Sequence, residues 1–570
     1  MHIHMHTHFY MHGREIVLAV LLTSTSALAQ VSAPLVAEPT FMGVSESVQT
    51  IALRAQTSAF AVRDFRPDRN HMRDKSLVSN ESRFGAELEP LVAIAAALPF
   101  NQTATFRPLG APLGVNFEAL GLGTPGFSIS GAPPDTTLAV SPTQIVQWVN
   151  SQFAVYNKAG VPLLAAPGFV QGNFVWQGLP AGSLCRTFNR GDPIVQYDRI
   201  NNRWILSQFA FDGNFASNAQ CIAVSQTSNA MGAYNLYEYN FGAVLPDYGK
   251  MGVWPDALYI TYNMFTNGQN FAGGRACAYD KAAMYGGAAA TQICFQSPTF
   301  FSYLPSDLDG TTLPPPGTPN IHVSWNFYNV ATAPYTMQLT KFVPNFGTPA
   351  LSTFNDGFGG AAFSFVAITM DANTFGACND SGGACVPQLG TANTLDTLGD
   401  RHMYRLVYRN FGDYSALLVT QAIDPDRTGT SKAQMRWWEI RNPASNPPVV
   451  YQNSTFNPSA DSRWMSSGAF DKRGNLGIGY SASSSAMNPA IRVTGRLKND
   501  PKNLLRTEVL VQAGGGSQTG TLSRWGDYST MQIDPVDDCT FWYTTQYIGV
   551  NGTFNWRTRI ASFKFPNCVP

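Results

Sequence analysis

The chain has 570 residues, with 37 basic and 37 acidic side chains and therefore no formal net charge. A neutral chain has no basic field, so we expect neither nucleic acid nor an anionic membrane surface as a partner. Charged residues make up only 13% and aromatic residues 12%, with 50 Gly and 37 Pro. This composition favours many short strands joined by turns and excludes a disordered chain.

The first 29 residues have the pattern of a secretory signal. Arg14 precedes an apolar stretch at residues 16–22, and the small-residue sequence at 27–29 forms a cleavage site before Gln30. The apolar stretch is too short to span a bilayer. We therefore predict a secreted mature chain, periplasmic or extracellular, without a membrane span.

The eight cysteines are expected to form disulfides, because an exported chain folds in an oxidising compartment. Eight cysteines allow many connectivities, and pairing between nearest neighbours is the most economical of them. The close pairs along the chain are Cys185 and Cys221, Cys277 and Cys294, Cys378 and Cys385, and Cys539 and Cys568.

After the signal, residues 30–127 are weakly periodic and are interpreted as a linker or loosely packed prefix, with one possible short helix at residues 87–98. From residue 128 to residue 570 the pattern changes to short alternating strands separated by turns. Residues 505–512, for example, alternate almost strictly, as a strand with one buried face does.

An internal repeat organises this second region. The sequence DYGKMGVWPD at residues 247–256 matches DYSTMQIDPVD at residues 527–537, and an aromatic-rich strand follows each copy. Looser copies begin at Asp135, Asp192 and Asp400, and another unit is expected near Ile321. This spacing gives about seven units.

Four strands can be drawn for the second unit, at residues 193–199, 203–211, 221–227 and 235–241. Four-stranded repeats closed in a ring avoid exposed sheet edges, so we predict an all-β fold, a β-propeller of about seven four-stranded blades. A string of β-sandwiches is the alternative. The last unit offers three strands, and we expect a segment before Asp135 to supply the fourth and close the ring.

Several long motifs resemble a family of exported bacterial proteins. They are GDPIVQYDRINNRWILSQF (residues 191–209), LPSDLDGTTLPPPGTPN (304–320), LGDRHMYRLVYRNFGDYSALLV (398–419) and SRWGDYSTMQIDPVDDCTFWYTTQY (523–547). The resemblance covers roughly residues 131–568. It implies export and a propeller-like fold, and it supplies no catalytic residues because the family has no assigned activity.

In such a ring, the acidic residues that begin each unit should converge at one mouth of the axis, beside several basic residues. We predict a ligand-binding ring there. Its members are Asp135, Asp192, Asp247, Lys250, Asp400, Arg401, Asp461, Arg463, Arg524 and Asp527. Alternatively, each Asp caps only its own turn. Carboxylates placed close together need a cation, either these basic groups or Ca²⁺ at the same ring.

Asp527 and Asp192 are the candidates for the two carboxylates of a glycoside hydrolase. The stretch Asp307-Leu-Asp309-Gly310 superficially resembles a calcium loop, and we interpret it as a surface turn because a Pro-rich run follows it. Three functions therefore remain open. The first is a protein, expected to be a monomer, that binds an extracellular carbohydrate or protein at one face of the ring. The others are a glycoside-active hydrolase and a structural envelope or matrix protein.

Overall fold

A computed structural model describes residues 33–55, 92–95, 100–129, 131–298, 301–325, 336–370, 375–378, 383–425 and 432–569. Regular structure in these residues is almost entirely β-strand, which confirms the all-β class. The predicted signal at residues 1–29 lies outside the described ranges. Of the helices in those ranges, none has the length and apolarity needed to cross a membrane.

Consecutive strands pair into antiparallel sheets, which we number as units 1 to 7 in chain order. Unit 1 consists of β6 (Thr136–Val140), β7 (Gln144–Val149), β8 (Gln152–Asn157) and β9 (Phe169–Gln171). Unit 2 consists of β10 (Ile194–Asp198), β11 (Arg203–Phe211), β12 (Asn218–Ser225) and β13 (Tyr234–Gly242). Unit 3 consists of β14 (Val244–Val253), β15 (Leu258–Thr266), β16 (Asn270–Tyr279) and β17 (Gln292–Ser297). Short helices accompany them: η2 (Gly172–Gly178), α3 (Leu184–Thr187) and α4 (Lys281–Gly286).

Units 4 and 5 share one sheet, because β18 and β26 pair in parallel. They consist of β18 (Leu304–Asp309), β19 (Asn320–Trp325), β20 (Thr336–Val343), β21 (Thr353–Asn355) and β22 (Val366–Thr369), with η3 (Pro349–Leu351); and β26 (Leu406–Asn410), β27 (Ser415–Asp424), β28 (Gln434–Arg441) and β29 (Val449–Phe456), with β23 (Phe375–Gly376) paired to β27. Units 6 and 7 consist of β30 (Ser462–Phe470), β31 (Leu476–Ser484), β32 (Met487–Arg496) and β33 (Val509–Gln512); and β34 (Thr530–Ile533), β35 (Phe541–Ile548) and β36 (Trp556–Phe563).

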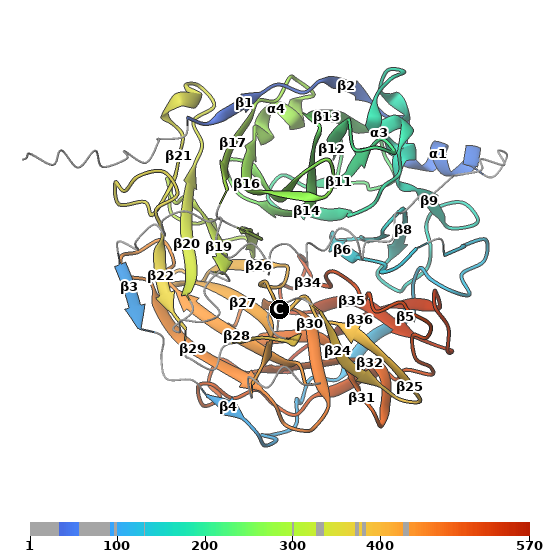
Figure 1. Ribbon diagram of the computed structural model, residues 1–570, viewed down its shortest axis with the longest axis vertical. Coiled ribbons are helices and arrows are strands. Elements are labelled where there is room, and N and C mark those ends of the chain that lie inside the picture. The colour runs from blue at the N-terminus through green and yellow to red at the C-terminus, as the bar shows by residue number, and fades with distance from the viewer. Residues whose placement is uncertain are drawn as a thin grey trace, which may run out of the picture.

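The units follow one another around the middle of the molecule in chain order (Figure 1). The first strand of each unit contacts the first strand of the next, from β6 through β10, β14, β18, β26 and β30 to β34, and β34 contacts β6. Each sheet therefore packs between two neighbours. Both faces of β12, for example, are buried along its whole length. A strand covered on two faces in this way needs apolar or hydrogen-bonded side chains throughout.

The strands of unit 2 lie where the alternation and turn signals predict them. β11 has the predicted bounds, and the other three strands differ from the predicted ones by at most three residues at either end. The strand expected at residues 505–512 is shorter, since β33 begins at Val509. The helix expected at residues 87–98 is wrong where the structure describes it, because β3 (Val92–Ala95) pairs in parallel with β22.

The described part of the prefix borders the outer strands of the units, and we call it the N-terminal belt. Its elements are β1 (Leu35–Ala37), β2 (Phe41–Val44), α1 (Val48–Ala55), β3, β4 (Asn101–Gln102) and β5 (Leu113–Glu118). β1 pairs with β17, β2 with β13, β4 with β29 and β5 with β36, while α1 contacts β9. In Figure 1 these blue elements lie at the periphery. They give the outer strands backbone partners that would otherwise be open edges.

All four nearest-neighbour disulfides are formed: Cys185–Cys221, Cys277–Cys294, Cys378–Cys385 and Cys539–Cys568. The pairing expected from sequence is thereby confirmed. One of them lies beside an insertion between units 4 and 5, the hairpin of β24 (Ala384–Gln388) and β25 (Thr391–Asp396). This hairpin contacts unit 6, and the Asp396 amide donates to the Ser523 carbonyl at 2.9 Å.

Candidate functional site

At the starts of units 1 to 3, one residue of each unit has a left-handed backbone conformation. Asp135 and Asp192 both have φ of 48°, just before β6 and β10, and Tyr248 has φ of 56° beside the bulge in β14. Asp and Asn tolerate this left-handed region better than most residues. In unit 3 the tyrosine, not Asp247, occupies the left-handed position, so the repeat is offset there by one residue.

Lys250 is the cation around which the acids of this end of the axis gather. Its side chain is fully buried, and Nζ lies 3.4 Å from the ring centroid of Tyr248 and 4.1 Å from that of Tyr528. Burial lowers the pKa of Lys250 to about 8, and the negative charges of Asp192, Asp527, Asp135 and Asp247 oppose that lowering. Four of the sequence-predicted Asp residues therefore lie close enough to one buried ammonium group to act on its charge. We call this the Lys250 cluster.

Arg401 and Asp400 lie at the edge of the same cluster as a pair. The guanidinium donates two hydrogen bonds of 2.8 Å to the carboxylate, and its Cζ lies 4.6 Å from the ring centroid of Tyr248. Burial lowers the pKa of Arg401, but the Asp400 carboxylate more than offsets this, so the pKa is raised above its ordinary value. Arg401 remains a cation at any accessible pH.

Arg524 pairs with Asp527 and also with Asp396, at 3.2 Å. The Asp527 amide in turn donates to Asp135 at 3.2 Å. The insertion that carries Asp396 thus joins the Lys250 cluster, which the sequence did not predict. Tyr248 and Tyr528 were also missed, although both stand in the repeated Asp-Tyr pair that aligned the two units.

Two predicted ring residues lie elsewhere. Arg463 is fully buried and pairs with Glu508 at 2.8 Å, and Glu508 also binds Arg492 and Tyr480. Asp461 hydrogen-bonds Ser459, and its carbonyl accepts from Arg463. The left-handed residue of unit 6 is Met465, with φ of 51°. Because the acid precedes that position by four residues, it does not point to the place where the others meet.

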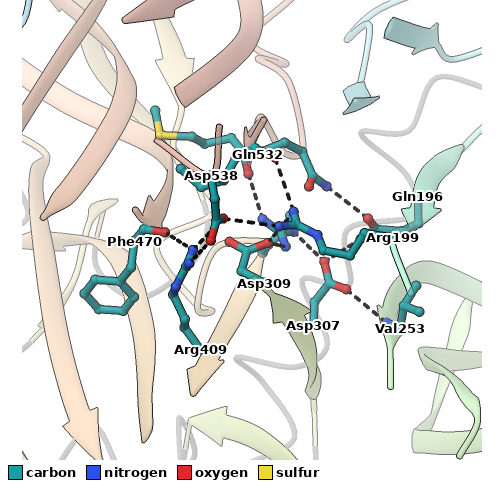
Figure 2. Close-up of polar contacts among 12 residues, drawn as sticks. Gln196, Arg199, Val253, Asp307, Asp309, Arg409, Phe470, Gln532 and Asp538 are labelled. Atoms are coloured by element: carbon teal, nitrogen blue, oxygen red, sulfur yellow. Dashed lines mark hydrogen bonds and ion pairs between the residues drawn. The ribbon is translucent and has the colours of Figure 1, made fainter. Parts of the chain in front are cut away.

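A second ionic network fills the axis where the first strands run (Figure 2). Arg405 binds Asp307 at 2.5 Å and Asp309 at 2.7 Å, and all three side chains are buried. Arg199 lies 3.4 Å from Asp309 and 3.6 Å from Asp538. We call this the axial network.

Neutral groups complete the axial network. Gln196 donates to Asp307 at 2.7 Å, Gln532 donates to Gln196 at 2.9 Å, and the Val253 amide donates to Asp307 at 3.0 Å. The members come from units 2, 3, 4, 5 and 7. Asp307 and Asp309 lie on β18 in the interior, so their interpretation as a surface turn is wrong; contacts from other units, which no local pattern reveals, bury them.

The pKa values of the two axial carboxyl groups shift in different directions. Burial raises the pKa of Asp307, and its contact with Arg405 does not fully cancel this. Burial also acts on Asp309, but Arg405 and Arg199 together hold the pKa of Asp309 below its ordinary value. Asp309 thus carries a permanent negative charge that matches the guanidinium groups around it.

The proposed catalytic acids, Asp192 and Asp527, are only 3% and 6% exposed. Both interact with Lys250, and Asp527 is also bound to Arg524. Glycoside hydrolysis needs a carboxyl pair that reaches a sugar from both sides. A buried, cation-bound pair does not meet that need.

In the described ranges, neither a metal-binding group of side chains nor a histidine placed for proton transfer is present. No group of three or more His, Cys, Asp or Glu side chains there is placed to hold a metal ion. His322 and His402 are buried among aromatic rings, and burial lowers the pKa of each to about 3. They are neutral core residues at physiological pH.

No family model matches this chain, and no curated protein matches it either. Among solved structures it is similar to an α-L-arabinanase of Penicillium chrysogenum complexed with arabinobiose, at 7% identity over 80% of this chain and 100% of that one, with a TM-score of 0.35. It is also similar to a sialidase of Trypanosoma rangeli in complex with the inhibitor DANA (9% identity, 65% and 54%, TM-score 0.31) and to the WD40 domain of SCAP from fission yeast (8%, 82% and 93%, TM-score 0.30). TM-scores this low carry nothing about activity, so the chemistry rests on this chain's own residues.

Proposed function

We propose that the chain is an exported β-propeller of about seven four-stranded blades that binds an extracellular carbohydrate or protein at one face of the ring without transforming it. Units 1 to 7 are the blades in this proposal. Its support is the chain of contacts between first strands, which returns from β34 to β6, and the pairing of β5 with β36, which gives unit 7 its fourth strand.

Export is part of the proposal. Four disulfides among the described residues suit an oxidising compartment. The signal-like segment at residues 1–29 and the resemblance to a family of exported bacterial proteins agree with this destination.

One observation favours binding over hydrolysis: the two candidate catalytic acids, Asp192 and Asp527, are buried and lie beside cations of the chain. Charges neutralised inside the protein are not available to a sugar. A ligand must therefore be held by side chains at the surface, away from the axis. The hydrolase remains the competing hypothesis, because the same acids would be its catalytic groups.

The test is incubation of residues 30–570 with a panel of polysaccharides and glycans, followed by mass spectrometry of products and of retained ligand. We expect retention of at least one glycan and no new products. Products that disappear in Asp527→Asn but persist in the control Asp461→Asn, which lies outside the Lys250 cluster, would establish the hydrolase instead. Absence of both retention and products would favour a structural role or a protein ligand.

A further inference from the structure

A stack of aromatic and basic side chains lies on units 5 and 6, at the end where their first strands finish. Tyr414 belongs to the turn between β26 and β27, Arg441 ends β28, and Tyr451 lies on β29. Lys498 and Lys502 come from the connection between β32 and β33. The Lys250 cluster lies at the other end of the first strands, so this surface is separate from it. We call these five residues the tyrosine–cation surface.

Rings and cations alternate along this surface. The Arg441 guanidinium carbon lies 3.8 Å from the ring centroid of Tyr414 and 3.2 Å from that of Tyr451. Lys502 Nζ lies 3.7 Å from the ring of Tyr451, and Lys498 Nζ lies 5.4 Å from that of Tyr414. Each cation is thus held by a ring face, which fixes the spacing of positive charge in the absence of a ligand.

The surface is reachable and its scaffold is rigid. Lys498 and Lys502 are exposed, while Tyr414, Arg441 and Tyr451 are partly exposed. The backbone beneath it is pinned, since the Lys498 amide donates to Asn475 at 3.0 Å and the Asn503 amide donates to Gln452 at 3.2 Å. Ligands pay little ordering entropy at a preformed surface of this kind.

Basic side chains outnumber acidic ones here, although the whole chain is neutral. The basic residues of the surface and of the adjoining turn are Arg441, Lys472, Arg473, Lys498 and Lys502, and the acidic ones nearby are Asp413, Glu439, Asp471 and Asp500. Glu439 is already bound to Arg441 and Asp500 to Arg506, each at 2.7 Å. Within the described part of the chain, neither Lys498 nor Lys502 forms an ion pair. The local field is therefore positive.

We propose that the tyrosine–cation surface binds an acidic polysaccharide, a polymer whose sugars carry carboxylate or sulfate groups. The lysine and arginine groups bind the anionic substituents through charge-assisted hydrogen bonds, while the two tyrosine rings hold those cations in place. A row of fixed positive charges matches a sugar polymer that carries an anionic group at regular intervals. This inference rests on the proposed binding function and names its ligand class.

Polygalacturonate carries carboxylates, dextran sulfate carries sulfates and dextran is neutral, so binding of the full mature chain to these three probes is measured at about 0.15 M salt. We expect binding to polygalacturonate, to dextran sulfate or to both, and none to dextran. Lys502→Glu and Tyr451→Leu should each weaken that binding about tenfold or more. Whichever charged probe binds more tightly identifies carboxylate or sulfate as the recognised group.

The matched control is Arg54→Glu, which reverses one exposed charge on α1, far from the surface in the ring order. It should change the affinity less than about twofold, and thermal melts should show that all three variants are folded. Equal weakening by Arg54→Glu, tighter binding of single-stranded DNA than of either polymer, or no binding of charged polymers would overturn the inference. Retention of a neutral glycan with unchanged affinity in Lys502→Glu would overturn it while leaving the proposed function intact.

Discussion

Lys250 is fully buried, and more acidic residues act on its ammonium group than it could pair with directly. Its ammonium group has the faces of two tyrosines and the carbonyl of Gly249, at 3.2 Å, as its direct contacts. The acids act on it through the field that they create together. At the residue scale, then, the lysine serves to neutralise carboxylates that the repeated unit starts bring to one place.

Replacing Lys250 with Met should lower the free energy of unfolding by about 3–5 kcal/mol at neutral pH, because it leaves buried carboxylates without a cation. The lowered pKa also sets a pH dependence. Between pH 8 and 10.5 the native protein releases this proton while the unfolded chain still holds it, so stability from this group rises with pH. Denaturant unfolding of both proteins should show the deficit of the variant widening across that window; parallel curves would contradict the assignment.

At the scale of elements, β5 is the strand that pairs with the most distant part of the sequence. It adds to the edge of β36, where Ile560 lies opposite Phe117 and Ala561 opposite Asn116. Its strand partners are more than 400 residues away in sequence, so β5 joins the start of the chain to its end. The sequence predicted that a segment before Asp135 supplies this strand, because the last unit had only three.

Replacing residues 113–118 with a Gly/Ser segment of equal length should lower the melting temperature by about 10 °C, because β36 then becomes an open edge. The same replacement should promote association, which light scattering after mild heating would detect. An unchanged melt would mean that β5 contributes nothing to closure. A Gly/Ser replacement of the loop at residues 344–348, between β20 and η3, should leave both readings unchanged.

Sequence predicted well what is local and poorly what is not. The strands of unit 2 follow from alternation and turn residues, and the disulfides follow from short spacing. The belt strands β1 and β4 have two to three residues each, too few for a periodic signal. Most acids of the Lys250 cluster were predicted from the unit starts, but Asp396 was not, because it reaches the cluster from an insertion. Arg405 of the axial network was not predicted either, because its carboxylate partners belong to another unit. Only the three-dimensional arrangement brings such residues together.

At the scale of the whole molecule, the axial network links units that lie far apart along the chain. Arg405 alone reaches Asp307 and Asp309 of unit 4 and, at 2.9 Å, the Met531 carbonyl of unit 7. The Asp307 carboxylate also accepts hydrogen bonds from Gln196 of unit 2 and from the Val253 amide of unit 3. Units that do not follow one another along the chain are therefore also linked directly.

Arg405→Leu should lower the free energy of unfolding by about 3–5 kcal/mol, since it leaves two buried carboxylates without their principal cation. It should also broaden the calorimetric transition, because the units lose their link across the axis. Arg203→Leu, which removes an arginine that donates only to nearby carbonyl groups at a turn, is the control. A narrow transition at the wild-type temperature in Arg405→Leu would show that contacts along the ring suffice.

The N-terminal belt has a consequence for the order in which the protein can be assembled. Strands made early, such as β1 and β2, find their partners only after units 2 and 3 have been synthesised, and β5 must wait for β36, the last strand of the chain. A growing chain therefore cannot complete its outer rim before nearly all of it exists. The early strands of the N-terminal belt therefore stay without their partners while most of the chain is made.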